Sequence, residues 1–107
     1  MGERIYVTEI MNAPQEPDVS LARCRVPVGV TTQLHSLSVT EWYMIEVGTG
    51  VIEIDGAQAE VRPGDCLRIA PSQSQRITNT GEEDLIFMTL CQPRFVPECY
   101  RSLEEDL

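Results

Sequence analysis

Lysine is absent from this chain of 107 residues, and histidine occurs only once. All eight basic residues are arginines, so neither a Schiff-base lysine nor the lysine of a phosphate-binding P-loop is available. The formal net charge of −9 disfavours nucleic acids and anionic membrane surfaces as partners, because both are bound through basic faces. The absence of lysine thus excludes whole classes of enzymes, and the charge makes nucleic acid a disfavoured partner.

Long apolar runs are also missing, and the opening residues do not resemble a secretory leader. No stretch approaches the roughly 20 apolar residues that cross a bilayer, and the opening MGERIYVTEI has neither a basic start nor an apolar core. We therefore expect a cytoplasmic protein. The cysteines form no C-x-x-C pair, which gives no support for a zinc ribbon or a thioredoxin-like site. Cys24, Cys66 and Cys91 lie in apolar, strand-like stretches, where buried reduced thiols are the simpler interpretation.

What the sequence does contain is a series of short β-rich runs separated by turn signals, which is typical of an all-β sandwich or barrel. Apolar residues make up 42% of the chain, and we expect residues 1–107 to form one domain. The predicted strands cover residues 4–10, 21–26, 31–39, 41–47, 51–54, 59–61, 66–69, 75–78 and 85–91. Asp55-Gly56 is a two-residue hairpin signal, because both residue types tolerate positive φ.

The pattern changes after Pro93. Pro97 suits the first turn of a helix, and Phe95, Tyr100 and Leu103 would share the face of that helix that meets the barrel. We expect a short C-terminal helix here.

Strand alternation indicates where polar groups enter the interior. Side chains two residues apart share a face, so Glu41 points the same way as Tyr43 and Ile45. The same parity, extended back through the preceding strand, places His35 on that face. A carboxylate among apolar side chains is costly unless it is paired, hydrogen-bonded or bound to a cation, and this cost indicates a site.

Two spaced motifs carry a family resemblance. The first consists of Gly29, His35, Leu37, Glu41 and Gly48, separated by five, one, three and six residues. The second consists of Gly64, Ala70, Ser72, Gln75 and Asn79, separated by five, one, two and three residues. This spacing resembles the two conserved motifs of small single-domain cupins, with Leu37 and Gln75 standing where the family has histidines.

The resemblance implies a cupin-type antiparallel β-barrel, also called a double-stranded β-helix or jelly roll. Cupins usually bind a divalent metal through three histidines and a glutamate, so His35, Glu41 and Gln75 are the candidate ligands for manganese, iron, nickel or zinc. A metal-free polar pocket with His35 and Glu41 as catalytic groups, and a purely structural hydrogen-bonded network, are the alternatives.

A ligand pocket in the barrel is the functional expectation, with Tyr43, Gln75, Asn79 and Met88 as further pocket residues. Side chains such as Tyr43 and Met88 are more often plain core residues than pocket residues. The resemblance implies a dioxygenase, isomerase or lyase acting on a small carbohydrate-like or carboxylate compound, and the alternative is a non-catalytic binding or sensing module. We also expect a homodimer, in which residues 4–10 would serve as an exchanged strand.

Overall fold

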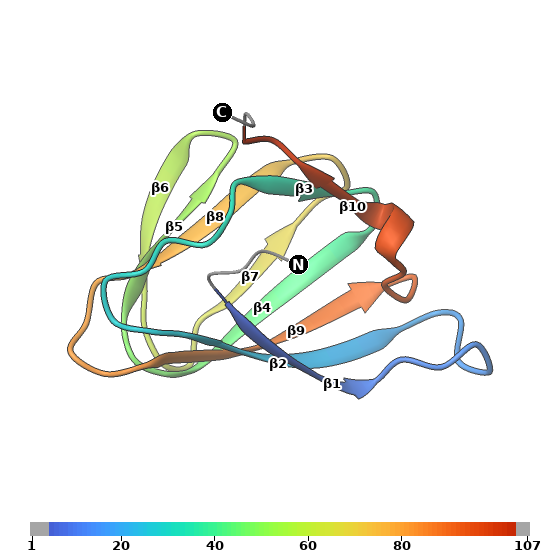
Figure 1. The fold of residues 1–107 in the computed structure, drawn as a ribbon, viewed down its shortest axis with the longest axis horizontal. Coiled ribbons are helices and arrows are strands. Elements are labelled where there is room, and N and C mark those ends of the chain that lie inside the picture. The colour runs from blue at the N-terminus through green and yellow to red at the C-terminus, as the bar shows by residue number, and fades with distance from the viewer. Residues whose placement is uncertain (1–4, 105–107) are drawn as a thin grey trace.

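Two five-stranded antiparallel sheets face each other in the computed structural model, which describes residues 5–104 (Figure 1). The first sheet has the strand order β1-β2-β9-β4-β7, and the second has the order β10-β3-β8-β5-β6. The strands are β1 (Tyr6–Met11), β2 (Ser20–Val26), β3 (His35–Leu37), β4 (Thr40–Val47), β5 (Gly50–Ile54), β6 (Ala57–Val61), β7 (Cys66–Ile69), β8 (Ser74–Asn79), β9 (Leu85–Gln92) and β10 (Tyr100–Ser102). This is the predicted all-β jelly-roll architecture.

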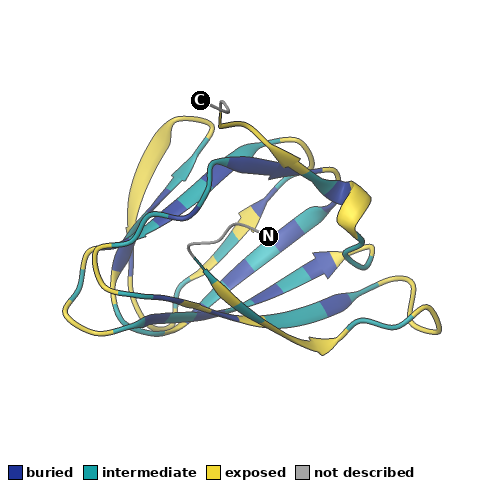
Figure 2. Ribbon diagram, viewed as in Figure 1, coloured by how far each residue is buried: buried dark blue, intermediate teal, exposed yellow. Residues whose placement is uncertain are grey.

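Alternation of buried and half-buried residues along the strands builds the interior between the sheets (Figure 2). In the two central strands β4 and β9, every second residue points inward, and Ile45 pairs with Phe87 across them. Ile52 and Ile77 pair in the same way on the opposite sheet. These side chains are at most 4% exposed and form the main apolar core. Their burial is the principal force that closes the two sheets on each other.

Turn chemistry sets the strand registers. Asp55 and Gly56 have φ angles of 50° and 82°, which is the left-handed geometry of the predicted two-residue hairpin between β5 and β6. Gly48 has a φ of 86°, and a Cβ built there would lie 2.8 Å from the backbone oxygen of Asp84. Only glycine therefore fits this last position of the first motif without strain.

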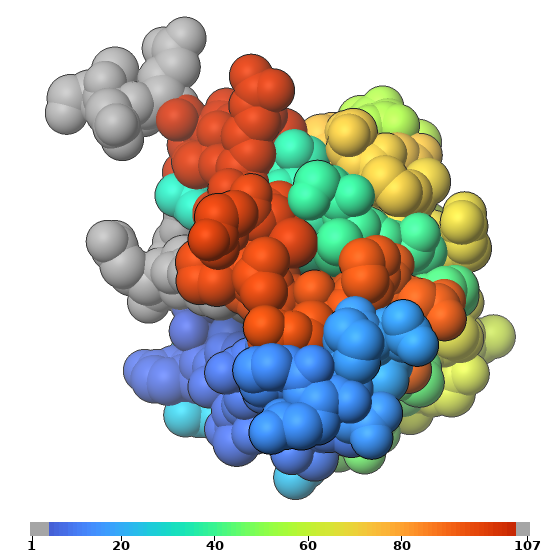
Figure 3. Space-filling model, turned by 90° about the vertical axis from the view of Figure 1, so that its right-hand side faces the viewer, coloured from blue at the N-terminus to red at the C-terminus, as the bar shows by residue number. Residues whose placement is uncertain are grey.

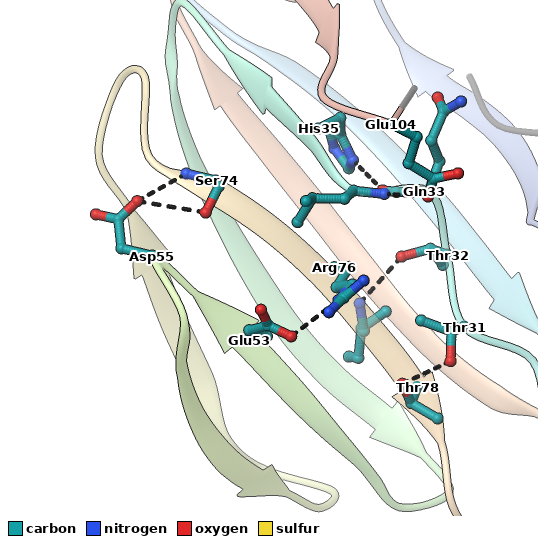
Figure 4. A network of polar contacts seen from close by, with 12 residues as sticks. Thr31, Thr32, Gln33, His35, Glu53, Asp55, Ser74, Arg76, Thr78 and Glu104 are labelled. Carbon is teal, nitrogen blue, oxygen red and sulfur yellow. Dashed lines mark hydrogen bonds and ion pairs between the residues drawn. The ribbon is translucent and has the colours of Figure 1, made fainter. Parts of the chain in front are cut away.

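The strand predicted over residues 31–39 is shorter than expected. Only His35–Leu37 forms a regular strand, and Thr31 makes an isolated bridge to Thr78. The approach to β3 is instead held by side chains, because the Thr31 and Thr78 hydroxyls lie 2.8 Å apart and Thr32 accepts a hydrogen bond from the backbone N–H of Ile77 (Figure 4). These bonds fix the direction in which the chain enters the His35 position.

The predicted C-terminal helix is wrong. Residues Pro97–Cys99 form a single 3-10 turn (η1), and β10 follows directly as an edge strand beside β3. The backbone of β3 needs partners on both sides, and pairing with β10 satisfies it, which a helix at this place would not. Leu103, expected to face the barrel, is 37% exposed. No helix in residues 5–104 is long and apolar enough to span a membrane.

Candidate functional site

A cavity of about 620 Å³ lies between the two sheets, at the end of the barrel where η1 and the chain after β1 lie. Inward-facing residues of β1, β2, β3, β4 and β9 form its walls, together with the segment from Arg94 to Tyr100. Most of the wall is apolar, with Val7 and Phe87 from the first sheet and Leu37 from the second. Glu9, Pro97 and Glu98 are the exposed members of the lining and mark where the cavity meets solvent.

Glu41 supplies a carboxyl group to the cavity wall from the beginning of β4. The residue is only 5% exposed, as the alternation of β4 predicts. Its Oε2 accepts a weak hydrogen bond from the Cys91 thiol at 3.9 Å, and its Oε1 has no hydrogen bond to any of residues 5–104. Burial raises the pKa of Glu41 to about 7, while the neighbouring Gln75 and Cys91 side chains offset part of this effect.

Gln75 and Tyr43 form the polar layer behind this carboxyl group. The Tyr43 hydroxyl donates a hydrogen bond of 2.6 Å to Oε1 of Gln75, and both side chains are buried. Nε2 of Gln75 has no ordinary hydrogen bond within residues 5–104, but it lies near enough to Glu41 to favour the ionised carboxylate. Burial also raises the pKa of Tyr43 well above its usual value. Tyr43 lines the cavity and Gln75 lies behind the wall.

His35 lines the cavity from β3 on the opposite sheet. Nδ1 lies 2.7 Å from the backbone oxygen of Gln33, and a carbonyl can only accept, so Nδ1 carries the proton (Figure 4). The ring stacks on Tyr100 with 4.7 Å between the ring centroids. Burial lowers the pKa of His35, which favours the neutral imidazole with its lone pair on Nε2.

Two thiols complete the inner surface near Glu41. Cys24 on β2 and Cys91 on β9 both line the cavity. Burial raises the pKa of Cys24 to about 12 and raises that of Cys91 as well, with the Glu41 carboxylate adding to both. They are therefore neutral, unreactive thiols, in agreement with the interpretation from the sequence. Cys66, by contrast, is exposed.

Besides Gln75, two other predicted pocket residues do not line the cavity. Nδ2 of Asn79 donates to the backbone oxygens of Val26 and Glu83 at 2.9 and 2.8 Å, so this side chain holds together the loop after β8. Met88 lies on the outer face of β9, because the lining residues of that strand are Phe87 and its alternates. The alternation of side chains along β9 can be read from the sequence, and it assigns the odd-numbered residues Phe87, Thr89 and Cys91 to the cavity instead of Met88.

Thr89 and Arg94 are among the lining residues that the sequence analysis did not anticipate. Thr89 follows from the same parity. Arg94 comes after β9 in an irregular segment, where alternation gives no indication of direction.

The residues present do not fit the metal site that the family resemblance implies. Leu37 puts an apolar wall where a second histidine would stand, and Oε1 of Gln75 already accepts the Tyr43 hydroxyl. His35 and Glu41 remain as two cavity-facing ligands, fewer than the three or four that usually hold such an ion. No group of three or more His, Cys, Asp or Glu side chains in the described part of the chain is placed to hold a metal. A metal held by His35, Glu41 and Gln75 is an expectation from the family resemblance, and these contacts do not support it.

Comparison with known proteins shows the family. The chain matches the cupin domain over residues 22–91. It is 34% identical to an uncharacterized protein of Methanocaldococcus jannaschii over 87 residues, which are 79% of this chain and 69% of that protein.

Solved structures support the same fold. A predicted oxalate decarboxylase from Thermotoga maritima superposes with a TM-score of 0.76 at 26% identity, covering 83% of this chain and 80% of that one. Oxalate decarboxylase from Bacillus subtilis gives 0.85 at 19% identity, covering 96% of this chain and only 29% of the larger enzyme. The match over residues 22–91 and the two facing sheets together show that this chain belongs to the cupin family.

Proposed function

We propose that the barrel binds a small organic molecule with an apolar body, and that Glu41 and His35 contact its reactive polar group without a metal. The observation that carries this proposal is the cavity itself, of about 620 Å³, with a carboxyl group and an imidazole on opposite sheets of an otherwise mostly apolar wall. Such a combination of an apolar lining and a few polar groups is typical of ligand sites.

The wall favours a carboxylate with a hydrocarbon part over a carbohydrate. A sugar presents hydroxyl groups in every direction, and those facing Leu37, Phe87 or Val7 would lose their hydrogen bonds to water without replacement. Oxalate, which the names of two relatives give as their substrate, has no apolar part to occupy this cavity. A ligand with a hydrocarbon body and one or two carbonyl or carboxylate groups suits both the apolar lining and the few polar side chains of the wall.

Proton transfer is the chemistry that the two polar groups can supply. Nε2 of neutral His35 can accept a proton, and Glu41, with a pKa of about 7, can either hold or release one near neutral pH. An acid and a base on opposite sides of a ligand suit isomerisation or elimination next to a carbonyl or carboxylate group. Of the reactions implied by the family, these two need nothing beyond the side chains present.

A non-catalytic binding module is the second candidate. The observation that favours it is Leu37, which stands where the family has a metal-binding histidine. A protein that binds an organic ligand without catalysing a reaction loses no function when this histidine is replaced by an apolar residue.

Binding can be tested with the neutral fluorescent dye N-phenyl-1-naphthylamine, whose emission rises in apolar cavities. We expect the wild type to bind it and Ala22→Phe, which places a ring in the cavity, to bind at least several-fold more weakly. Ala59→Phe on the exposed surface of β6 is the matched control and should bind as the wild type does. Absence of binding, or equal binding by all three proteins, would contradict the proposal.

Catalysis can be separated from binding with the natural ligand. Organic compounds extracted from the purified protein are identified by mass spectrometry and incubated with it in D2O. Deuterium incorporation by the wild type and its loss in Glu41→Gln would support proton transfer. Binding without incorporation would favour the non-catalytic module.

A further inference from the structure

Arg94 is an unusual residue in the cavity wall. It follows β9, is half-buried, and is the only arginine among the lining residues of the described chain. The chain contains no lysine, so among residues 5–104 the guanidinium is the only permanent positive charge on that wall. A cation in a mostly apolar cavity is costly unless an anion or several acceptors surround it.

The guanidinium is held in place by neighbouring polar groups. One nitrogen, Nη1, donates to Oδ1 of Asn12 at 2.8 Å. Nδ2 of Asn12 in turn donates to Oε2 of Glu9 at 2.6 Å and to the backbone oxygen of Phe95 at 2.8 Å. The backbone N–H of Arg94 donates to the oxygen of Pro17 at 3.1 Å. Figure 3 shows the end of the barrel where the segment after β1, coloured blue, lies against the segment after β9, coloured orange.

Three other arginines of the described chain are paired with carboxylates. Arg23, Arg25 and Arg76 each have a carboxylate oxygen within 3.6 Å or less. Arg94 has no carboxylate at ion-pair distance in residues 5–104, and only one of its five guanidinium N–H groups has an acceptor there. Its side chain is thus fixed by Asn12 while most of its donors remain available to another group.

We propose that Arg94 binds the carboxylate of the ligand in the barrel cavity. This inference rests on the proposed function, because it names the group that a ligand of that cavity would carry. A planar carboxylate matches the guanidinium fork with two parallel hydrogen bonds. The acidic lining residues Glu9 and Glu98 do not prevent it, since both are exposed and screened by water and salt.

The position of Arg94 also relates the carboxylate of the ligand to Glu41. Cys91 pairs with Glu41 across β9 and β4, and Arg94 is three residues further along the chain. Three residues span at most about 10 Å, so the Arg94 backbone lies at the same end of the barrel as Glu41. The carboxylate and the group that meets Glu41 would therefore belong to one small molecule.

Two dyes with a common framework test this inference. N-phenyl-1-naphthylamine is neutral, and 8-anilinonaphthalene-1-sulfonate carries one anionic group in addition. We expect Arg94→Gln to weaken binding of the sulfonate by about 10-fold or more, which is the loss typical of a charge-assisted hydrogen-bonded pair, and to leave the neutral dye unchanged. Arg62→Gln is the matched control, because it removes the same charge from an exposed turn away from the cavity wall.

The outcomes separate the two proposals. Failure of the wild type to bind the neutral dye would overturn the proposed function. Binding of the neutral dye, with sulfonate binding equal in the wild type and Arg94→Gln, would overturn the role of Arg94 alone. Thermal melting of each variant checks folding. If Arg94→Gln does not fold, Arg94→Lys keeps the charge and loses the fork, and unchanged sulfonate affinity in it would overturn bidentate binding.

Discussion

Substituting Glu41 by Gln should remove a pH dependence from the stability of this protein. Burial raises the pKa of Glu41 from an ordinary value of 4.5 to about 7 in the folded chain. Between pH 4.5 and about 7, the folded state therefore retains a proton on Glu41 that the unfolded state has already lost. Stability is highest below pH 4.5 and falls as the pH rises toward 7, where the buried carboxyl group ionises.

The magnitude follows from the interval between these two pKa values. At 1.36 kcal/mol for each pH unit, an interval from 4.5 to about 7 corresponds to about 3 kcal/mol of unfolding free energy. This is a large part of the roughly 5–15 kcal/mol that stabilises a typical domain. Glu41→Gln has the same shape and cannot ionise, so its stability should lack this decrease.

Urea unfolding at pH 5, 6, 7 and 8 in the presence of EDTA measures the effect. We expect the variant to gain about 2–3 kcal/mol relative to the wild type between pH 5 and pH 8. Glu46→Gln is the matched control, because Glu46 lies on the same strand with its side chain exposed. A difference in unfolding free energy between wild type and Glu41→Gln that stays constant over this range would refute the reasoning. It would mean that the folded chain does not raise the pKa of this carboxyl group.

Three other predictions concern the site and the assembly. Elemental mass spectrometry should find less than one metal ion per chain in both the wild type and His35→Ala, whereas stoichiometric metal lost in the variant would support the His35, Glu41 and Gln75 ligand set. Tyr43→Phe should lower the unfolding free energy by about 1–3 kcal/mol in urea, because it removes the buried partner of Gln75, and an unchanged midpoint would contradict that bond. Light scattering should report a homodimer of twice the sequence mass, because β1 lies at a sheet edge and is available for pairing. A monomer would exclude the exchanged-strand dimer. Residue 4 of the predicted exchanged strand lies outside the described residues.

Local patterns in the sequence were sufficient for the fold and for part of the site. The period of two along β4 predicted that Glu41 points inward, and its 5% exposure confirms this. The Asp55-Gly56 turn was predictable because few residue types adopt positive φ without strain. The motif spacing placed His35 and Glu41 on the wall of one interior, where the structure brings them to the same cavity.

Long-range pairing decided what the local patterns could not. The segment after Pro97 has no strong preference of its own, and the unpaired edge of β3 makes it a strand instead of a helix. Asn79 has the parity of the interior, yet at a strand end the nearest unpaired backbone groups determine its bonds. Arg94 belongs to an irregular segment, so only the contacts of Asn12 direct it to the cavity. Sequence alone determined which faces are buried, because side-chain direction follows from local backbone geometry; which groups meet inside depended on tertiary contacts between residues far apart in the chain.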